Sequence, residues 1–106
     1  MSAPERLAHN EAVFREINER IEAGTWVTSA DQRIAFACEC AALGCNVLVE
    51  LTAAEYEAVR AHPRRFLLSP GHELPAIEVV VHRGDGYVVV EKQGEAAEVA
   101  EASDPR

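Results

Sequence analysis

The distribution of apolar residues along the chain predicts both helices and strands. Over residues 5–22, apolar side chains recur at intervals of three or four positions, and polar residues fill the opposite face. This spacing predicts an amphipathic helix that ends at Gly24. The apolar face of this helix consists of Leu7, Val13, Phe14, Ile17 and Ile21.

Residues 25–52 combine turn residues with two short apolar runs. Residues 25–33 carry cap and turn residues around Trp26, and we expect them to form a connector that drapes over the core. The segments 34–40 and 46–52 are rich in apolar and β-branched residues and are separated by a short loop. This pattern predicts two strands joined by a tight connection.

The second half of the chain predicts a short helix followed by a β-hairpin. Thr52 and Glu55 have the spacing of a capping box, in which each side chain satisfies a backbone donor of the first turn, so a helix over 53–62 is expected. A short extended stretch follows at 65–69. Two β-branched runs then flank a Gly-Asp-Gly turn, and residues 76–92 predict an antiparallel hairpin.

Length and charge narrow the classes of function. The chain has 106 residues, with 18 acidic and 10 basic side chains and a formal net charge of -8. A domain of this length buries only about 60–65% of the surface that its unfolded chain exposes, so an additional clamp on the fold is expected. The excess of acidic residues argues against nucleic acid as a partner, because binding to phosphates rests on Lys and Arg.

The sequence also predicts the cellular compartment of the protein. No apolar run reaches the roughly 18–20 residues that span a bilayer, and the charged N-terminal residues lack a signal-peptide pattern. We therefore expect a cytoplasmic protein with no membrane contact. Thiols stay reduced in that compartment, so the odd number of cysteines argues against a disulfide framework.

Three cysteines within eight residues are the strongest chemical signal. Cys38, Cys40 and Cys45 form a C-x-C-x4-C pattern. Residues i and i+2 of an extended segment point to the same side, so the first two sulfurs would face one point while Glu39 faces away. The loop that follows would return Cys45 to this point, and Gly44 would let the backbone come close to its sulfur. Three such sulfurs predict a metal site that lacks one ligand.

A histidine is the expected fourth ligand, because three cysteines and one histidine form a common structural zinc site. We favour His72, which lies in a Ser-Pro-Gly-His-Glu turn whose proline and glycine would hold the imidazole rigidly. Glu73 is placed to orient the other ring nitrogen or to lie near the ligands. His82 and His62 are the alternative ligands. The predicted Zn²⁺ ligands are Cys38, Cys40, Cys45 and His72.

Other roles of the three cysteines stay open. They could be buried free thiols, since cysteine is among the most buried residue types. Cys40 and Cys45 could form a reversible disulfide in a thiol-based redox or metal sensor. Without His72, three thiolates and a water molecule would form an open site, in which Glu73 or Glu39 could carry protons as in a small zinc hydrolase.

These features predict a small single α+β domain. A short antiparallel sheet would be flanked by the N-terminal amphipathic helix and a second short helix, with a metal site as the clamp. We divide the chain into an N-terminal helix at 1–24, a zinc-binding α+β core at 25–93 and an acidic tail at 94–106. The tail is rich in Ala and Glu, which favours a helix, and its last four residues are expected to fray.

The predicted function is that of a non-enzymatic zinc-binding protein that acts in regulation through protein–protein contact. Four ligands leave no position for water, so a closed site of this kind is structural. The helix at 5–22 is the expected contact surface for another protein or for a second copy. Alternatively, its apolar face packs on the domain's own sheet, and other faces of the protein would bind the partner.

Five segments of the sequence carry a resemblance. They are NEAVFREINERIE, FACEC with the third cysteine, LTAAEYEAVRAHPRRF, PGHE and DGYVVVEKQGEAAE. They lie between residues 10 and 98, and they resemble a group of small uncharacterised proteins from high-GC bacterial genomes. The resemblance extends over nearly the whole chain. The resemblance implies that the pattern defining this group includes Cys38, Cys40, Cys45 and His72. It implies a shared metal site and no particular activity.

Overall fold

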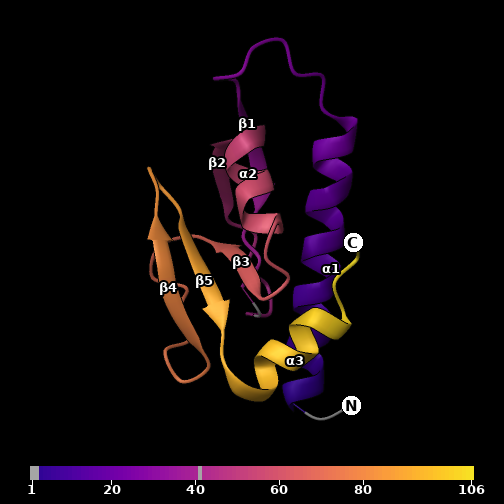
Figure 1. Cartoon of the computed structure of the whole chain (residues 1–106), viewed down its shortest axis with the longest axis vertical. Coiled ribbons are helices and arrows are strands. Elements are labelled where there is room, and N and C mark those ends of the chain that lie inside the picture. The colour runs from indigo at the N-terminus through magenta and orange to yellow at the C-terminus, as the bar shows by residue number, and fades with distance from the viewer. Residues whose placement is uncertain (1–2, 41) are drawn as a thin grey trace.

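A computed structural model describes residues 3–40 and 42–106, which form an α+β fold of the predicted class (Figure 1). This part of the chain contains three helices and two antiparallel sheets. The helices are α1 (Ala3–Gly24), α2 (Ala53–Arg60) and α3 (Gly94–Ala102). The strands are β1 (Arg33–Ala37), β2 (Leu48–Thr52), β3 (Arg65–Leu68), β4 (Glu78–Arg83) and β5 (Val88–Lys92).

The strands form two sheets where the sequence suggested one. β1 and β2 pair along their full length, with Phe36 opposite Val49. β5 lies between β3 and β4 in the second sheet. The two sheets meet where the chain leaves β1, because the backbone N–H of Glu39 donates to the carbonyl oxygen of Leu67 in β3 at 2.7 Å. The sheets are therefore joined next to the predicted metal ligands.

Two clusters of buried apolar side chains form the core. The first joins the β1–β2 sheet to α2, and within it the rings of Phe36 and Tyr56 stack with their centroids 4.3 Å apart. The second lies on the β3–β5–β4 sheet and includes Cys38 and Cys40 beside Phe66. Two of the predicted ligands are thus anchored in the core.

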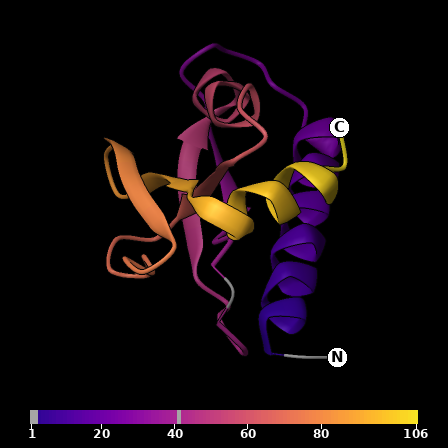
Figure 2. The same ribbon diagram turned by 60° about the horizontal axis from the view of Figure 1, so that its bottom comes forward.

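Helix α1 lies along one side of the molecule, in contact with β1 and α3 (Figure 2). Its most buried side chains are polar: Glu11, Arg15 and Asn18 are at most 9% exposed. Val13 and Ile17 are each 39% exposed, so the predicted apolar face is wrong at these two positions. The prediction assumed that polar residues face solvent, whereas these three have buried partners.

The C-terminal residues are held in place by ion pairs. The Asp104 carboxylate pairs with Arg15 at 3.1 Å and with Arg60. Arg106 donates two hydrogen bonds to the carboxylate of Glu57, at 2.7 and 2.9 Å. These charged side chains meet opposite charges on α1 and α2, which opposes fraying of the last four residues. The fraying itself stays a prediction.

The connector between α1 and β1 extends away from the two sheets (Figure 1). Trp26 is 85% exposed. The loop forms hydrogen bonds within itself, since the carboxamide oxygen of Gln32 accepts from the Thr28 backbone N–H at 2.8 Å. The prediction that this connector drapes over the core is wrong, because local hydrogen bonds satisfy its polar groups away from the core.

Two local predictions are confirmed. Thr52 and Glu55 form both hydrogen bonds of the capping box at the start of α2, at 2.8 and 3.2 Å. The β4–β5 hairpin closes through a hydrogen bond from the Gly84 N–H to the Tyr87 carbonyl oxygen at 2.9 Å. Gly86 in this turn has a φ of 81°, which favours glycine.

Candidate metal centre

His72 is presented by a tight turn between β3 and β4. The turn starts at Ser69, whose carbonyl oxygen accepts a hydrogen bond from the His72 N–H at 3.1 Å. Pro70 and Gly71 occupy its two central positions, and Gly71 has a φ of 90°. This combination is typical of a type II turn, in which proline fixes the first central residue and glycine accepts the positive φ of the second. The backbone that carries His72 is therefore rigid.

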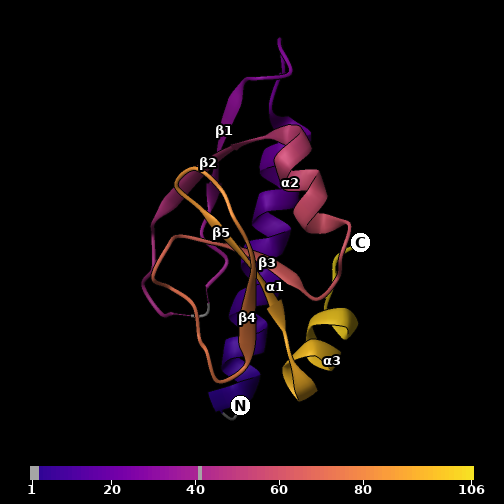
Figure 3. The same ribbon diagram turned by 60° about the vertical axis from the view of Figure 1, so that its left-hand side comes forward.

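Cys38 and Cys40 lie in the segment that follows β1. The Cys38 N–H donates to the Val47 carbonyl oxygen at 3.0 Å, which keeps this segment against the chain that leads into β2. The Cys38 sulfur accepts a hydrogen bond from the Ser69 N–H at 3.2 Å. Figure 3 shows the β3–β4 connection beside the loop that joins β1 to β2. The sulfur is thus already in contact with the turn that carries His72.

A second turn carries Cys45. The Cys45 N–H donates to the Ala42 carbonyl oxygen at 3.3 Å, and Gly44 has a φ of 77°. Apart from its two chain neighbours, a Cβ atom at Gly44 would have no atom within 4 Å, so the positive φ of the turn is what requires glycine here. The close approach of the backbone to the Cys45 sulfur stays a prediction. Ala41, which belongs to the predicted loop, lies outside the described residues.

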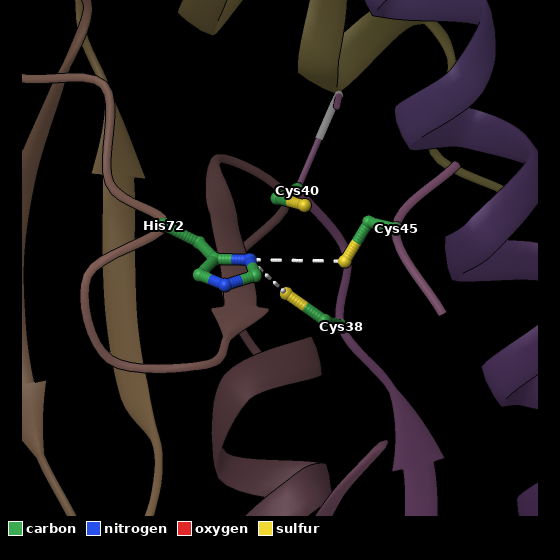
Figure 4. Close-up of side chains that lie close together, drawn as sticks. All are labelled: Cys38, Cys40, Cys45 and His72. Carbon is green, nitrogen blue, oxygen red and sulfur yellow. Dashed lines mark hydrogen bonds between the residues drawn. The ribbon is translucent and has the colours of Figure 1, made fainter. Parts of the chain in front are cut away.

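The structure brings together all four residues that the sequence singled out (Figure 4). One ligand atom from each of Cys38, Cys40, Cys45 and His72 lies within 4.8 Å of the others. His72 Nδ1 is 3.6 Å from the Cys38 sulfur and 3.7 Å from the Cys45 sulfur. All three cysteines are free thiols. A set of three sulfurs and one imidazole nitrogen this close together could hold a metal ion.

Burial controls the charge of the thiols. It raises the pKa of Cys38 above its usual value and raises that of Cys40 to about 12. Both thiols are therefore neutral at pH 7 until a cation replaces their protons. Cys45 and His72 are only half-buried, so the cluster reaches the surface on their side. A pocket of about 340 Å³ adjoins it, lined by Leu7, Cys40, Ala42, Gly71, His72 and Leu74.

The residues that were predicted as alternatives lie elsewhere. His82 and His62 are exposed, and neither joins such a cluster within the described chain. The Glu73 carboxylate accepts a hydrogen bond from the Gly71 N–H at 2.6 Å, so it supports the turn and does not orient the His72 ring as predicted. Glu39 points away from the sulfurs as predicted, and its side chain is buried in the protein interior.

Glu39 is part of a buried polar network that the sequence did not reveal. Its carboxylate accepts hydrogen bonds from Asn18 Nδ2 at 2.8 Å, the Leu67 N–H at 2.9 Å and the Tyr56 hydroxyl at 3.4 Å. The Asn18 side chain also bonds to both the N–H and the carbonyl oxygen of Ala37, each at 2.8 Å. Glu39, which lies between Cys38 and Cys40, is thus held by contacts with α1, α2 and β3.

One signal for this network was present in the sequence. Leu7, Glu11, Phe14, Asn18 and Ile21 follow one another at intervals of four and three, so they share one face of the helix. Glu11 and Asn18 are the two polar residues of that series, and their place on an otherwise apolar face indicates that each has a buried polar partner. The partners themselves come from distant segments and cannot be read from this spacing.

Comparisons with known proteins do not assign the chain to a family. No protein-family model matches the chain, and no curated protein or solved structure is significantly similar to it. Among the residues that the structure describes, no helix is long and apolar enough to cross a membrane.

Proposed function

We propose that this chain is a small non-enzymatic zinc-binding protein whose Cys38, Cys40, Cys45 and His72 hold one structural ion. The single observation that supports this best is the convergence of the four ligand atoms to within 4.8 Å. Membership of the group of high-GC bacterial proteins and a cytoplasmic location, where thiols remain reduced, are parts of the same proposal.

Two distances within the cluster fit a tetrahedral zinc ion. A tetrahedral zinc ion with bonds of about 2.3 Å to sulfur and about 2.0–2.1 Å to nitrogen places sulfur and nitrogen roughly 3.6 Å apart. The distances from His72 Nδ1 to the Cys38 and Cys45 sulfurs are 3.6 and 3.7 Å. Thiolate ligands also select soft ions such as zinc over magnesium or calcium.

The ion would act as a clamp between two parts of the fold. Its cysteine ligands follow β1 in one sheet, and His72 lies between two strands of the other sheet. A domain of this size has a small core, so a bond network across the two sheets adds substantially to its stability. Four protein ligands leave no site for water, which argues for a structural and not a catalytic ion.

Metal content and stability test this proposal. Protein purified without added zinc should contain about one zinc per chain by elemental analysis, and chelation should lower its melting temperature markedly. Cys40→Ser and His72→Ala should each lose the metal, while His82→Ala at an exposed histidine should keep it. A metal-free protein with titratable thiols and full stability would refute the proposal.

The alternative is a chemical role for the cysteines, as a redox or metal sensor or a small zinc hydrolase. Burial raises the pKa of Cys40 to about 12, so little nucleophilic thiolate is present without a metal. A hydrolase would need a water molecule in place of His72. If His72→Ala keeps both its zinc and its stability, the imidazole is not a ligand and the open site becomes the better proposal.

The partner would be another protein or a second copy. Val13 and Ile17 on α1 are exposed enough to contribute to such a contact. Deleting α1 would remove Arg15 and Asn18 from the interior, so point substitutions are the cleaner test. Val13→Glu with Ile17→Glu should abolish partner capture or self-association, measured by pull-down and sedimentation, while the melting temperature is retained. Unchanged association would exclude this surface.

A further inference from the structure

A second pocket lies between α1, α3 and the β3–β5–β4 sheet, apart from the cysteine cluster. Its volume of about 340 Å³ is at the lower end of the range of roughly 300–1,000 Å³ for small-molecule sites. Its walls are mostly apolar. They are formed by Leu7, Ala8, Phe66, Ile77, Ala96 and Val99. None of the four proposed metal ligands lines it, so its properties can be tested separately from the metal.

Two carboxylates interrupt the apolar lining. Glu11 of α1 and Glu95 of α3 both contribute to the pocket. Glu95 is exposed at its rim, whereas Glu11 is only 9% exposed. Any ligand that fills the pocket therefore meets negative charge from two helices.

The charges beneath the pocket do not balance. The Lys92 ammonium pairs with Glu78 at 2.6 Å and also with Glu11, so one buried cation serves two carboxylates. Arg15 lies over the ring of Phe66 and shares the Asp104 carboxylate with Arg60. Arg60 also pairs with Glu19 at 2.6 Å, so these two cations are matched by two carboxylates. The group of charges at this end of the pocket therefore keeps a negative excess.

Glu11 carries this excess. Both oxygens of Glu78 are satisfied, because Oε1 accepts from the Leu74 N–H at 2.7 Å and Oε2 binds Lys92. Glu11 shares Lys92 with Glu78 through its Oε2, and of these two carboxylates only Glu11 lines the pocket. Burial raises the pKa of Glu11 above its usual value, although the neighbouring Lys92 opposes the shift.

We propose that this pocket binds a small organic cation, a primary ammonium group on a short apolar body. The ammonium would donate to Glu11 and to Glu95, and the apolar body would lie against Phe66 and Val99. An organic anion of the same shape would be repelled by the two carboxylates. A neutral ligand would bury the same apolar surface without offsetting the excess negative charge at Glu11, so it should bind more weakly.

Three probes of equal chain length test this preference. Hexylammonium, 1-hexanol and hexanoate would each be titrated into the 106-residue chain as purified, with amide chemical shifts as the readout. We expect hexylammonium to shift the amides of Ala96 and Val99 in a saturable manner. Hexanol should bind at least fivefold more weakly, and hexanoate should cause no saturable shift. Equal affinity for the alcohol and the ammonium would overturn the proposal.

Two charge-neutral variants locate the ammonium. Glu11→Gln and Glu95→Gln should each weaken hexylammonium binding at least threefold. Glu98→Gln, at an exposed position of α3 that does not line the pocket, should leave the affinity unchanged. If Glu11→Gln disturbs the fold through Lys92, the exposed Glu95→Gln decides the question. Unchanged affinity in Glu95→Gln, with or without a result for Glu11→Gln, would contradict the predicted ammonium position.

Discussion

The side-chain amide of Asn18 donates a hydrogen bond to the buried carboxylate of Glu39, with Nδ2 and Oε2 2.8 Å apart. The same amide bonds to the N–H and carbonyl oxygen of Ala37, as a neighbouring strand would. Because Glu39 lies between Cys38 and Cys40, helix α1 positions the segment that carries two of the proposed ligands. The relationship links the longest helix to the candidate metal centre.

Substitution of Asn18 should therefore be costly. Asn18→Ala removes one of three donors to the buried Glu39 carboxylate and the side-chain partner of two Ala37 backbone groups, which should lower the free energy of unfolding by about 2–3 kcal/mol. Urea denaturation of the metal-loaded protein measures this. Arg20→Ala removes only an exposed pair with Glu16 and should cost at most about 0.5 kcal/mol. Equal effects of the two variants would mean that the Asn18 network contributes little.

Metal affinity should fall steeply with acidity. The pKa of Cys38 and that of Cys40 are raised by burial, so both thiols must release protons when a metal binds. With three thiolate ligands, the apparent affinity should drop by a factor of up to ~1,000 per pH unit. Competition with a chromophoric chelator at pH 7.5 and 6.5 measures this. A change of less than tenfold would argue against three thiolate ligands.

Asp104 should be essential to the stability of the fold. Its carboxylate lies between the guanidinium groups of Arg15 and Arg60, whose side chains are 0% exposed. Asp104→Ala leaves two buried positive charges without their shared partner, and we expect a loss of about 3–5 kcal/mol. Glu101→Ala removes an exposed pair with Arg64 and is the matched control, with an expected loss of at most about 1 kcal/mol.

Thermal or urea unfolding of the two variants distinguishes a buried pair from an exposed one. A loss for Asp104→Ala no larger than that for Glu101→Ala would show that the C-terminal segment is not held as the structure indicates.

The carboxyls of Glu22 and Glu57 should make stability depend on pH. Burial and the neighbouring Glu57 raise the pKa of Glu22 from 4.5 to about 7, while hydrogen bonds from Arg106 and Glu22 lower the pKa of Glu57 to about 2. The buried Glu22 Oε2 has no partner while it is ionised. Once protonated, it can donate to Glu57, so the folded protein retains a proton that the unfolded chain releases.

It follows that stability contributed by Glu22 is present below pH 4.5 and is lost as the pH rises towards 7. Glu22→Gln keeps a hydrogen-bond donor at all pH values, so the slope in this window should become flatter. Urea denaturation at half-unit steps from pH 4.5 to 7.5 measures the difference. Parallel curves for the two proteins would count against a raised pKa of Glu22.

Gly84 should tolerate no side chain. A Cβ atom there would lie 2.1 Å from Tyr87 Cε1, and this ring is buried and donates through its hydroxyl to Glu55 at 3.0 Å. The ring cannot move without losing that bond, so Gly84→Ala should cost about 1–3 kcal/mol. Gly24→Ala meets no atom within 4 Å and should be neutral or slightly stabilising in the same thermal melts. Comparable stability of both variants would contradict the close contact.

Local signals predicted most elements of this fold. The capping box at Thr52 and the glycine turn before Tyr87 are formed by residues close in sequence, so local preferences determine them. The spacing of Cys38 and Cys40, and the Pro-Gly turn before His72, likewise indicated which side chains could meet. Whether they bind zinc stays a prediction.

Tertiary structure alone decided which polar residues are buried. The partners of Arg15 and Glu39 come from segments up to 85 residues away, and no local pattern encodes such pairs. A buried charge is stable only where its partners converge on it. The sequence by itself therefore determined the elements and the four side chains of the candidate metal centre. The complete fold decided how α1 faces the sheets and what surrounds that centre.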